Sequence, residues 1–171
     1  TLQSLAFRAP IRYDVQRDVE RDELSRSRAQ LQLTGDVRVR LIGRKERGLQ
    51  LAALIGSGES FTSQWSTIYD QQTGEQNPIE LSARQLYLDY VHPAWRLSMG
   101  VIPPIKGVVS NTSMDRDGWI RGGRLVFNVG QCGLLELVSG AVDHLSSPSV
   151  FQRPSTWNYH ELEWTHSWLE P

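Results

Sequence analysis

Residues 31–41 read LQLTGDVRVRL, and apolar and polar side chains alternate at nearly every position of this stretch. The aliphatic residues fall on one side of an extended chain, and the polar residues, among them Arg38 and Arg40, fall on the other. A period of two residues is typical of a β-strand that presents one apolar and one polar face. The stretch therefore predicts a strand.

The same alternation recurs along most of the chain. It is found in residues 5–15, 48–56, 84–91, 95–101, 119–129, 134–143 and 158–168. Pro10 interrupts the first of these segments, and proline in a strand is expected at a sheet edge or at a bulge. No segment of comparable length has a helical period. The sequence predicts an all-β antiparallel fold of about eight strands, in which residues 1–171 form a single β-barrel domain or a half-barrel fragment.

The connections between these segments alternate between long and short. The long ones are residues 16–29, 57–83, 103–118 and 144–157, and the short ones are residues 44–47, 92–94 and 130–133. Transmembrane barrels of bacteria have short turns on one side of the membrane and long loops on the other. Tryptophan residues also lie near the expected strand ends, as in an interfacial girdle. This pattern predicts an antiparallel up-and-down transmembrane β-barrel in contact with outer-membrane lipid.

The composition excludes several other classes of protein. The net charge is −1, so the chain has no positive field for binding nucleic acid. Its 16 Arg far outnumber its 2 Lys, which favours guanidinium groups in fixed, partly enclosed positions. Cys132 is the single cysteine, which excludes an internal disulfide. The sequence has no run of about 18 apolar residues, so it predicts no membrane helix.

Four segments of the chain resemble a known family. They are FRAPIRYDV (7–15), RAQLQLTGDVRVRLIGR (28–44), GLQLAALIG (48–56) and ARQLYLDYVHPAWRLSMGV (83–101). Together they resemble the N-terminal half of Gram-negative outer-membrane porins of the alginate-export and phosphate-selective type. The residues that match are Arg12, Tyr13, Arg38, Arg40, Gln85, Tyr87, Leu88, Asp89, Tyr90 and Gly100. Val101 departs from the pattern, because the family usually has a lumen-facing arginine after this glycine.

This resemblance covers about residues 5–143 and implies a barrel of about sixteen strands, of which the chain holds about eight. The alternation assigns the polar side chains to the lumen of such a barrel, where they set the path of ions and solutes. The residues expected to line it are Arg8, Arg12, Asp14, Asp36, Arg38, Arg40, Tyr87, Asp89, Arg96, Arg124, Glu136, Glu161 and Glu163. Rows of arginine favour anionic solutes, although the carboxylates offset part of their charge.

No motif in the chain predicts catalysis, a metal site or a cofactor. Residues 115–118 read DRDG and match only a fragment of a calcium loop. His160 and His166 are about 20 Å apart along a strand, too far to share a metal. His166 and Ser167 are adjacent, so they point to opposite faces and cannot act as base and nucleophile. Cys132 reads as a small turn residue.

The leading prediction is a non-enzymatic, porin-like channel of the bacterial outer membrane for passive diffusion of small solutes. The channel is expected as a single copy or as a homo-oligomer. The first alternative is a soluble all-β barrel or sandwich that binds a carbohydrate or lipid, with Trp65, Trp157 and the long connections as its site. The second alternative is an eight-stranded membrane barrel with an enzymatic or structural role. If the aliphatic rows pack against a second sheet or a helix, the channel is excluded.

Overall fold

The computed structural model describes residues 1–18, 23–44, 46–58, 61, 65–74, 76, 78–104, 118–145, 149–154 and 156–166. These residues form eleven strands and one short 3-10 helix, and none of them lies in an α-helix. The strands are β1 (Leu2–Arg8), β2 (Ile11–Asp18), β3 (Glu23–Gln32), β4 (Thr34–Arg44), β5 (Arg47–Ser57), β6 (Trp65–Asp70), β7 (Leu81–His92), β8 (Trp95–Ile102), β9 (Ile120–Asn128), β10 (Leu134–Ala141) and β11 (Tyr159–Thr165), and the 3-10 helix is η1 (Gly130–Cys132).

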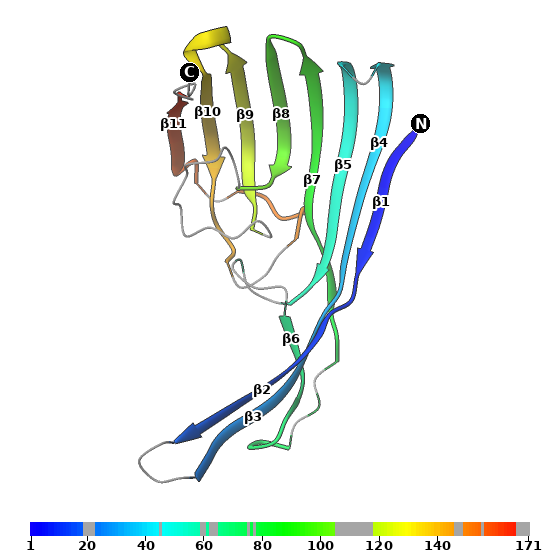
Figure 1. Ribbon diagram of the computed structural model, residues 1–171, viewed down its shortest axis with the longest axis vertical. Coiled ribbons are helices and arrows are strands. Elements are labelled where there is room, and N and C mark those ends of the chain that lie inside the picture. The colour runs from blue at the N-terminus through cyan, green and yellow to red at the C-terminus, as the bar shows by residue number, and fades with distance from the viewer. Residues whose placement is uncertain are drawn as a thin grey trace.

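Eight of the strands form one antiparallel sheet in the order β1-β4-β5-β7-β8-β9-β10-β11 (Figure 1). Each of these strands pairs with the next one along the chain within the sheet, so the topology is up-and-down. Each of the eight segments expected from the alternation overlaps one of these strands. The prediction of an all-β, antiparallel, up-and-down fold is therefore confirmed. The sheet is open, because its first strand β1 and its last strand β11 are not paired with each other among the described residues.

A smaller sheet of three strands, in the order β2-β3-β6, extends beyond the large sheet, and we call it the arm (Figure 1). It corrects three expectations. Residues 5–15 are not one strand, since the chain breaks at Ala9 and Pro10 between β1 and β2. Residues 16–29 are not a long connection, because β2 and β3 pair across them as a hairpin. The connection over residues 57–83 contains β6, which pairs with β3.

Short turns gather at one end of the large sheet. The turns between β4 and β5, between β7 and β8, and between β9 and β10 all lie at the upper end in Figure 1, and β1 begins and β11 ends toward it. Gly43, near the end of β4 beside the first of these turns, has a φ of +91°, a conformation that other residues rarely adopt. The expected sorting of short and long connections to opposite ends is present in this sheet.

Two small hydrophobic clusters lie toward the other end of the sheet. Ala52, Tyr87, Ile102, Ile120 and Val138 form the first, and Phe61, Val101 and Trp119 form the second. Phe61 and Trp119 meet edge to face at 4.8 Å between ring centroids. Leu88, Leu97 and Leu125 of the central strands belong to neither cluster.

Candidate functional site

The two faces of the large sheet differ in chemistry, and the strand register defines them. Directly paired residues share a face. One row of paired residues reads Arg40–Gln50–Asp89–Ser98–Arg124–Val138–Glu161, and we call the face that carries it the inner face. A neighbouring row on the opposite, outer face reads Ile42–Leu49–Tyr90–Leu97–Leu125–Leu137–Leu162. The inner row is polar at six of seven positions, and the outer row is apolar throughout.

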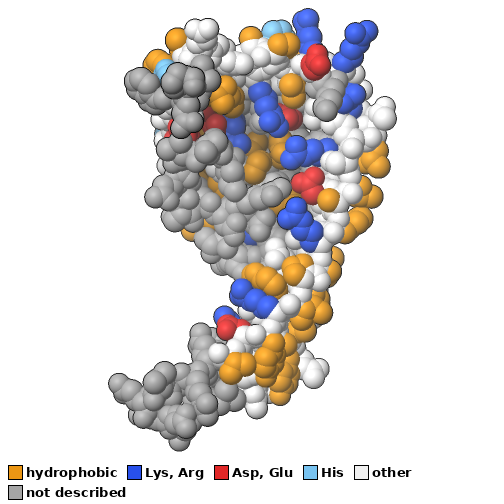
Figure 2. All heavy atoms as spheres, viewed as in Figure 1, with side chains coloured by type: hydrophobic (Ala, Val, Ile, Leu, Met, Phe, Trp, Pro, Cys, Tyr) orange, Lys and Arg blue, Asp and Glu red, His pale blue; other side chains and the backbone are white. Residues whose placement is uncertain are grey.

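Several polar side chains of the inner face are buried, whereas many apolar side chains of the outer face are exposed, the reverse of what is usual in a water-soluble protein. Gln50, Asp89, Ser98 and Glu136 on the inner face are buried. Large apolar side chains on the outer face are exposed, and they include Leu5, Phe7, Ile42, Ile55, Leu86, Leu88, Met99, Phe127, Leu137, Leu162 and Trp164. In Figure 2, blue and red side chains run along the face turned to the viewer, and orange side chains crowd its right-hand margin and the arm. Exposed apolar area on this scale is an informative departure from a water-soluble surface.

The centre of the inner face is held by Asp89. The Arg96 guanidinium donates to both carboxylate oxygens of Asp89, with Nε–Oδ1 at 2.8 Å and Nη2–Oδ2 at 2.6 Å. The Ser98 hydroxyl donates to Oδ1 at 2.9 Å. The Asp89 side chain is 3% exposed and that of Arg96 is 45% exposed. The carboxylate is therefore fixed in the wall, while the guanidinium reaches from it toward open space.

A second ion pair joins β9 to β10. Arg124 Nε lies 2.9 Å from Glu136 Oε1, and both side chains are largely buried. Arg124 also donates to the carbonyl oxygen of Pro103 at 2.6 Å, and Gln85 donates to the carbonyl oxygen of Gly118 at 2.7 Å. These two hydrogen bonds bring backbone at both ends of the β8–β9 connection onto the inner side of the sheet. The inner face therefore holds main chain as well as side chains.

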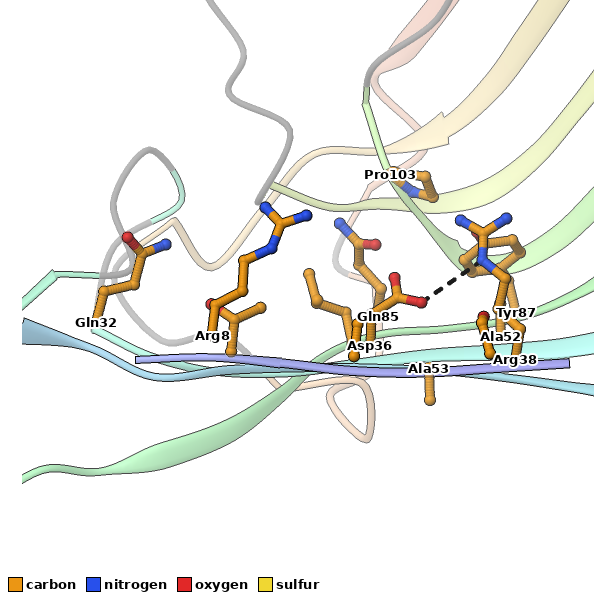
Figure 3. A pocket seen from close by; sticks show the side chains of 13 residues that line it. Arg8, Gln32, Asp36, Arg38, Ala52, Ala53, Gln85, Tyr87 and Pro103 are labelled. Carbon is orange, nitrogen blue, oxygen red and sulfur yellow. Dashed lines mark ion pairs between the residues drawn. The ribbon is translucent and has the colours of Figure 1, made fainter. Parts of the chain in front are cut away.

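A cavity of about 440 Å³ opens on the inner face beside β1 and β4 (Figure 3). Arg8, Asp36, Arg38, Gln85 and Tyr87 point into it from one side of the sheet, whereas Ala53 points away. The pair between Arg38 Nε and Asp36 Oδ1 is long, at 3.6 Å, and both side chains are 35–39% exposed. Guanidinium, amide and phenol groups offer this cavity several hydrogen-bond donors for a polar solute.

Charge is unevenly distributed across the inner face. Arg8, Arg38 and Arg40 lie on β1 and β4 at one side, accompanied by Asp36. Glu136, Glu161 and Glu163 lie on β10 and β11 at the other side, where Tyr159 donates to Glu161. The inner face therefore carries mainly basic side chains on β1 and β4 and acidic side chains on β10 and β11.

Eleven of the thirteen residues expected to line a lumen share the inner face of the large sheet. They are Arg8, Asp36, Arg38, Arg40, Tyr87, Asp89, Arg96, Arg124, Glu136, Glu161 and Glu163. Arg12 and Asp14 lie instead on β2 in the arm. Arg12 Nε donates to Gln30 and its guanidinium stacks 4.3 Å from the Trp65 ring, and Asp14 pairs with Arg28 at 2.9 Å.

One charged cluster was not expected from the sequence. Arg121 is buried, pairs with Asp143 at 3.1 Å, and donates to the carbonyl oxygens of Ser149 and Gln152 at 2.8 Å each. Trp119 Nε1 donates to the carbonyl oxygen of Asp143. The cluster ties the β10–β11 connection to the sheet on the outer-face register. The alternation within the strand places Arg121 and Arg124 on opposite faces, but it does not show which connection covers Arg121.

The remaining sequence candidates contribute little to a site. No group of three metal-ligating side chains occurs among the described residues. His160 bonds to Ser139 on β10, and Cys132 lies exposed in η1. Residues 115–117 of the calcium-like fragment, and Ser167 beside His166, lie outside the described residues.

Comparisons with known proteins do not assign a family. No family description matches the sequence, and no curated protein or solved structure is significantly similar to the chain. Within the described residues, no helix is long and apolar enough to cross a membrane.

Proposed function

We propose that this chain forms part of the wall of a water-filled β-barrel channel in a bacterial outer membrane. Small solutes, anionic ones included, diffuse passively through this channel. The observation that carries the proposal is a reversal of polarity near the short-turn end of one sheet: Leu88 and Leu137 on the outer face are exposed, whereas Asp89 and Glu136 on the inner face are buried. The resemblance of four segments to porins of the alginate-export and phosphate-selective type also supports the proposal.

The outer face suits lipid in both composition and height. Leu49, Leu51, Ala53 and Ile55 alternate along β5 and span about 20 Å at 3.3 Å per residue. Aromatic residues flank this apolar zone: Tyr90 stacks on Trp95 at 5.1 Å near the short turns, and Trp157 donates to Ser139 nearer the long connections. The apolar band of an outer-membrane barrel is about 25 Å tall and is bordered by aromatic girdles.

The inner face suits a wet lumen. Its charges are held in position by neighbours on adjacent strands, as in the contacts of Asp89 with Arg96 and Ser98. Arg38 and Arg96 remain partly exposed and can offer N–H donors to a passing solute. Neither face packs against a second sheet or an α-helix within the described residues. The soluble binding domain is the alternative, and it predicts that the outer face tolerates charge.

A matched pair of substitutions tests which face meets lipid. Leu88 on the outer face is 44% exposed, and Leu145 in the β10–β11 connection is 51% exposed. In water the two leucines would tolerate arginine alike. In a bilayer Leu88→Arg should cost about 2–4 kcal/mol near the midplane and Leu145→Arg much less. We expect insertion into lipid vesicles to fail selectively for Leu88→Arg, and equal insertion or detergent-free solubility of both variants would refute the proposal.

Planar-bilayer conductance tests the lumen. Arg38 and Arg40 lie on the basic side of the inner face, and replacing both with alanine removes two positive charges from the solute path. We expect the anion-to-cation permeability ratio to fall, because rings and rows of fixed charge set ion selectivity. Arg47→Ala, at the exposed start of β5, serves as the control and should leave the ratio near the wild-type value. An unchanged ratio in the double variant argues against an inner-face path.

A further inference from the structure

One ion pair on the inner face is much looser than its neighbour. Arg38 Nε lies 3.6 Å from Asp36 Oδ1, whereas Arg96 meets Asp89 at 2.6 Å. Within the described part of the chain, neither Arg38 nor Asp36 makes a hydrogen bond, and both side chains are 35–39% exposed. A guanidinium has five N–H donors and a carboxylate has about four acceptor positions, so nearly all of these remain available to a bound molecule.

The hydroxyl of Tyr87 on β7 is a further polar group without a partner. Tyr87 is only 6% exposed and lines the same cavity of about 440 Å³, yet its hydroxyl makes no hydrogen bond to any described residue. The hydroxyl of a buried tyrosine usually finds a partner, because leaving it unpaired costs free energy. The cavity therefore encloses a polar group that a bound molecule can satisfy.

The strand register places these groups around a small apolar floor. One row of paired residues reads Arg38–Ala52–Tyr87, so the guanidinium and the phenol rise from β4 and β7 on either side of Ala52 in β5. The backbones of β4 and β7 are about 10 Å apart, because neighbouring strands lie about 4.8 Å apart. Ala52 and Leu54 are buried at the base of this gap, and Figure 3 shows Asp36, Arg38 and Tyr87 on the same side of the sheet.

The charges of this cavity select against simple ions. Asp36 would repel a lone anion bound to Arg38, and Arg38 would repel a lone cation bound to Asp36, because the two charged groups lie within 4 Å of each other. A molecule that carries a carboxylate and an ammonium side by side satisfies both groups without adding net charge. Hydrogen bonds between charged partners are about twice as strong as neutral ones, so such a zwitterion gains more here than a polyol does.

We propose, resting on the function proposed above, that this cavity binds the zwitterionic head group of a free α-amino acid on its way through the channel. The Arg38 guanidinium and the Tyr87 hydroxyl donate to the carboxylate of the amino acid, and its ammonium group donates to Asp36. Ala52 and Leu54 form the floor beneath the Cα atom. The volume of about 440 Å³ lies in the range of small-molecule sites, so room remains for side chains of different sizes.

Isothermal titration calorimetry of the full chain in detergent tests the chemical class of the ligand. L-Alanine carries both charged groups, whereas propionate lacks the ammonium and ethylamine lacks the carboxylate. We expect L-alanine to bind about tenfold or more tightly than either of the other two, since only L-alanine satisfies both members of the loose pair. The proposal is overturned if propionate binds as tightly as L-alanine, if glucose binds more tightly, or if L-alanine does not bind.

Two substitutions test the assigned contacts. Asp36→Asn should weaken L-alanine binding about tenfold and strengthen propionate binding, because the repulsion of an anion is removed. Tyr87→Phe keeps the ring and should weaken the binding of both molecules about threefold through the lost hydroxyl. Glu46→Gln, in the exposed turn between β4 and β5, is the matched control and should bind both molecules as wild type does.

The outcomes separate this inference from the proposed function. Equal weakening of L-alanine and propionate binding by Asp36→Asn, or unchanged binding to Tyr87→Phe, overturns the assignment of the head group. A protein that conducts ions across a planar bilayer but does not bind L-alanine removes this inference alone. A protein that is monodisperse in plain buffer removes the proposed function, whatever it binds.

Discussion

The pair formed by Asp89 and Arg96 allows a prediction whose asymmetry comes directly from burial. Asp89 is 3% exposed and Arg96 is 45% exposed, so the two partners differ in what they leave behind. Arg96→Ala leaves the Asp89 carboxylate buried with the Ser98 hydroxyl as its remaining side-chain donor among the described residues, and breaking a buried pair in this way costs about 3–5 kcal/mol. Asp89→Ala leaves a guanidinium that water can reach, so we expect about 2 kcal/mol.

The double variant and a matched control complete this experiment. Asp89→Ala combined with Arg96→Ala should cost less than Arg96→Ala alone, because no buried charge remains. Asp36→Ala removes a carboxylate from a 3.6 Å pair whose partners are both partly exposed, and it should cost about 1 kcal/mol or less.

Urea unfolding in detergent micelles, followed by tryptophan fluorescence, measures these free energies. The expected order of cost is Arg96→Ala, then Asp89→Ala and the double variant, then Asp36→Ala. Equal costs for the two single variants of the pair would refute the reasoning from burial. So would a cost for Arg96→Ala no larger than that for Asp36→Ala.

Two further predictions concern the geometry of the sheet and its covering connection. A Cβ on Gly122 would overlap the carbonyl oxygen of Ser139, whereas a Cβ on Gly123 would meet nothing closer than 3.5 Å. Gly122→Ala should therefore lower the free energy of unfolding by about 1–3 kcal/mol more than Gly123→Ala. Similar urea midpoints for both would contradict the close approach. Arg121→Ala removes the donor that holds Asp143, Ser149 and Gln152, so chymotrypsin should cleave after the exposed Phe151 several-fold faster than in wild type or in Arg153→Ala. Unchanged cleavage would mean that the connection is held by other contacts.

The alternation of residues was sufficient to predict where most strands of the large sheet lie and the face on which most polar candidates lie, and the connections predicted the antiparallel order. It did not predict the break at Ala9 and Pro10 between β1 and β2. The prediction succeeds elsewhere because a strand of period two sends successive side chains to opposite faces whatever its neighbours are. The inner positions of Arg38, Asp89 and Glu136 follow from parity alone.

Other features could not be predicted because they depend on pairing between distant segments. Residues 16–29 are mostly polar, so no alternation marks β3, which forms by pairing with β2 as a hairpin beyond Pro10. Gly122 and Gly123 are adjacent glycines, and only the close approach of the Ser139 carbonyl oxygen shows that Gly122 has no room for a side chain. The different surroundings of Arg121 and Arg124 likewise arise from the connection that folds over the former.

The sequence by itself determined that this chain is all-β and two-faced, since both properties are local and repeat every two residues. Only the tertiary structure decided that aliphatic side chains such as Leu88 stay exposed. It also decided that Asp89 pairs with Arg96 and that Glu136 pairs with Arg124, each across neighbouring strands. Those properties depend on register and on which distant segments meet, and the pattern within a strand contains no information about its partners.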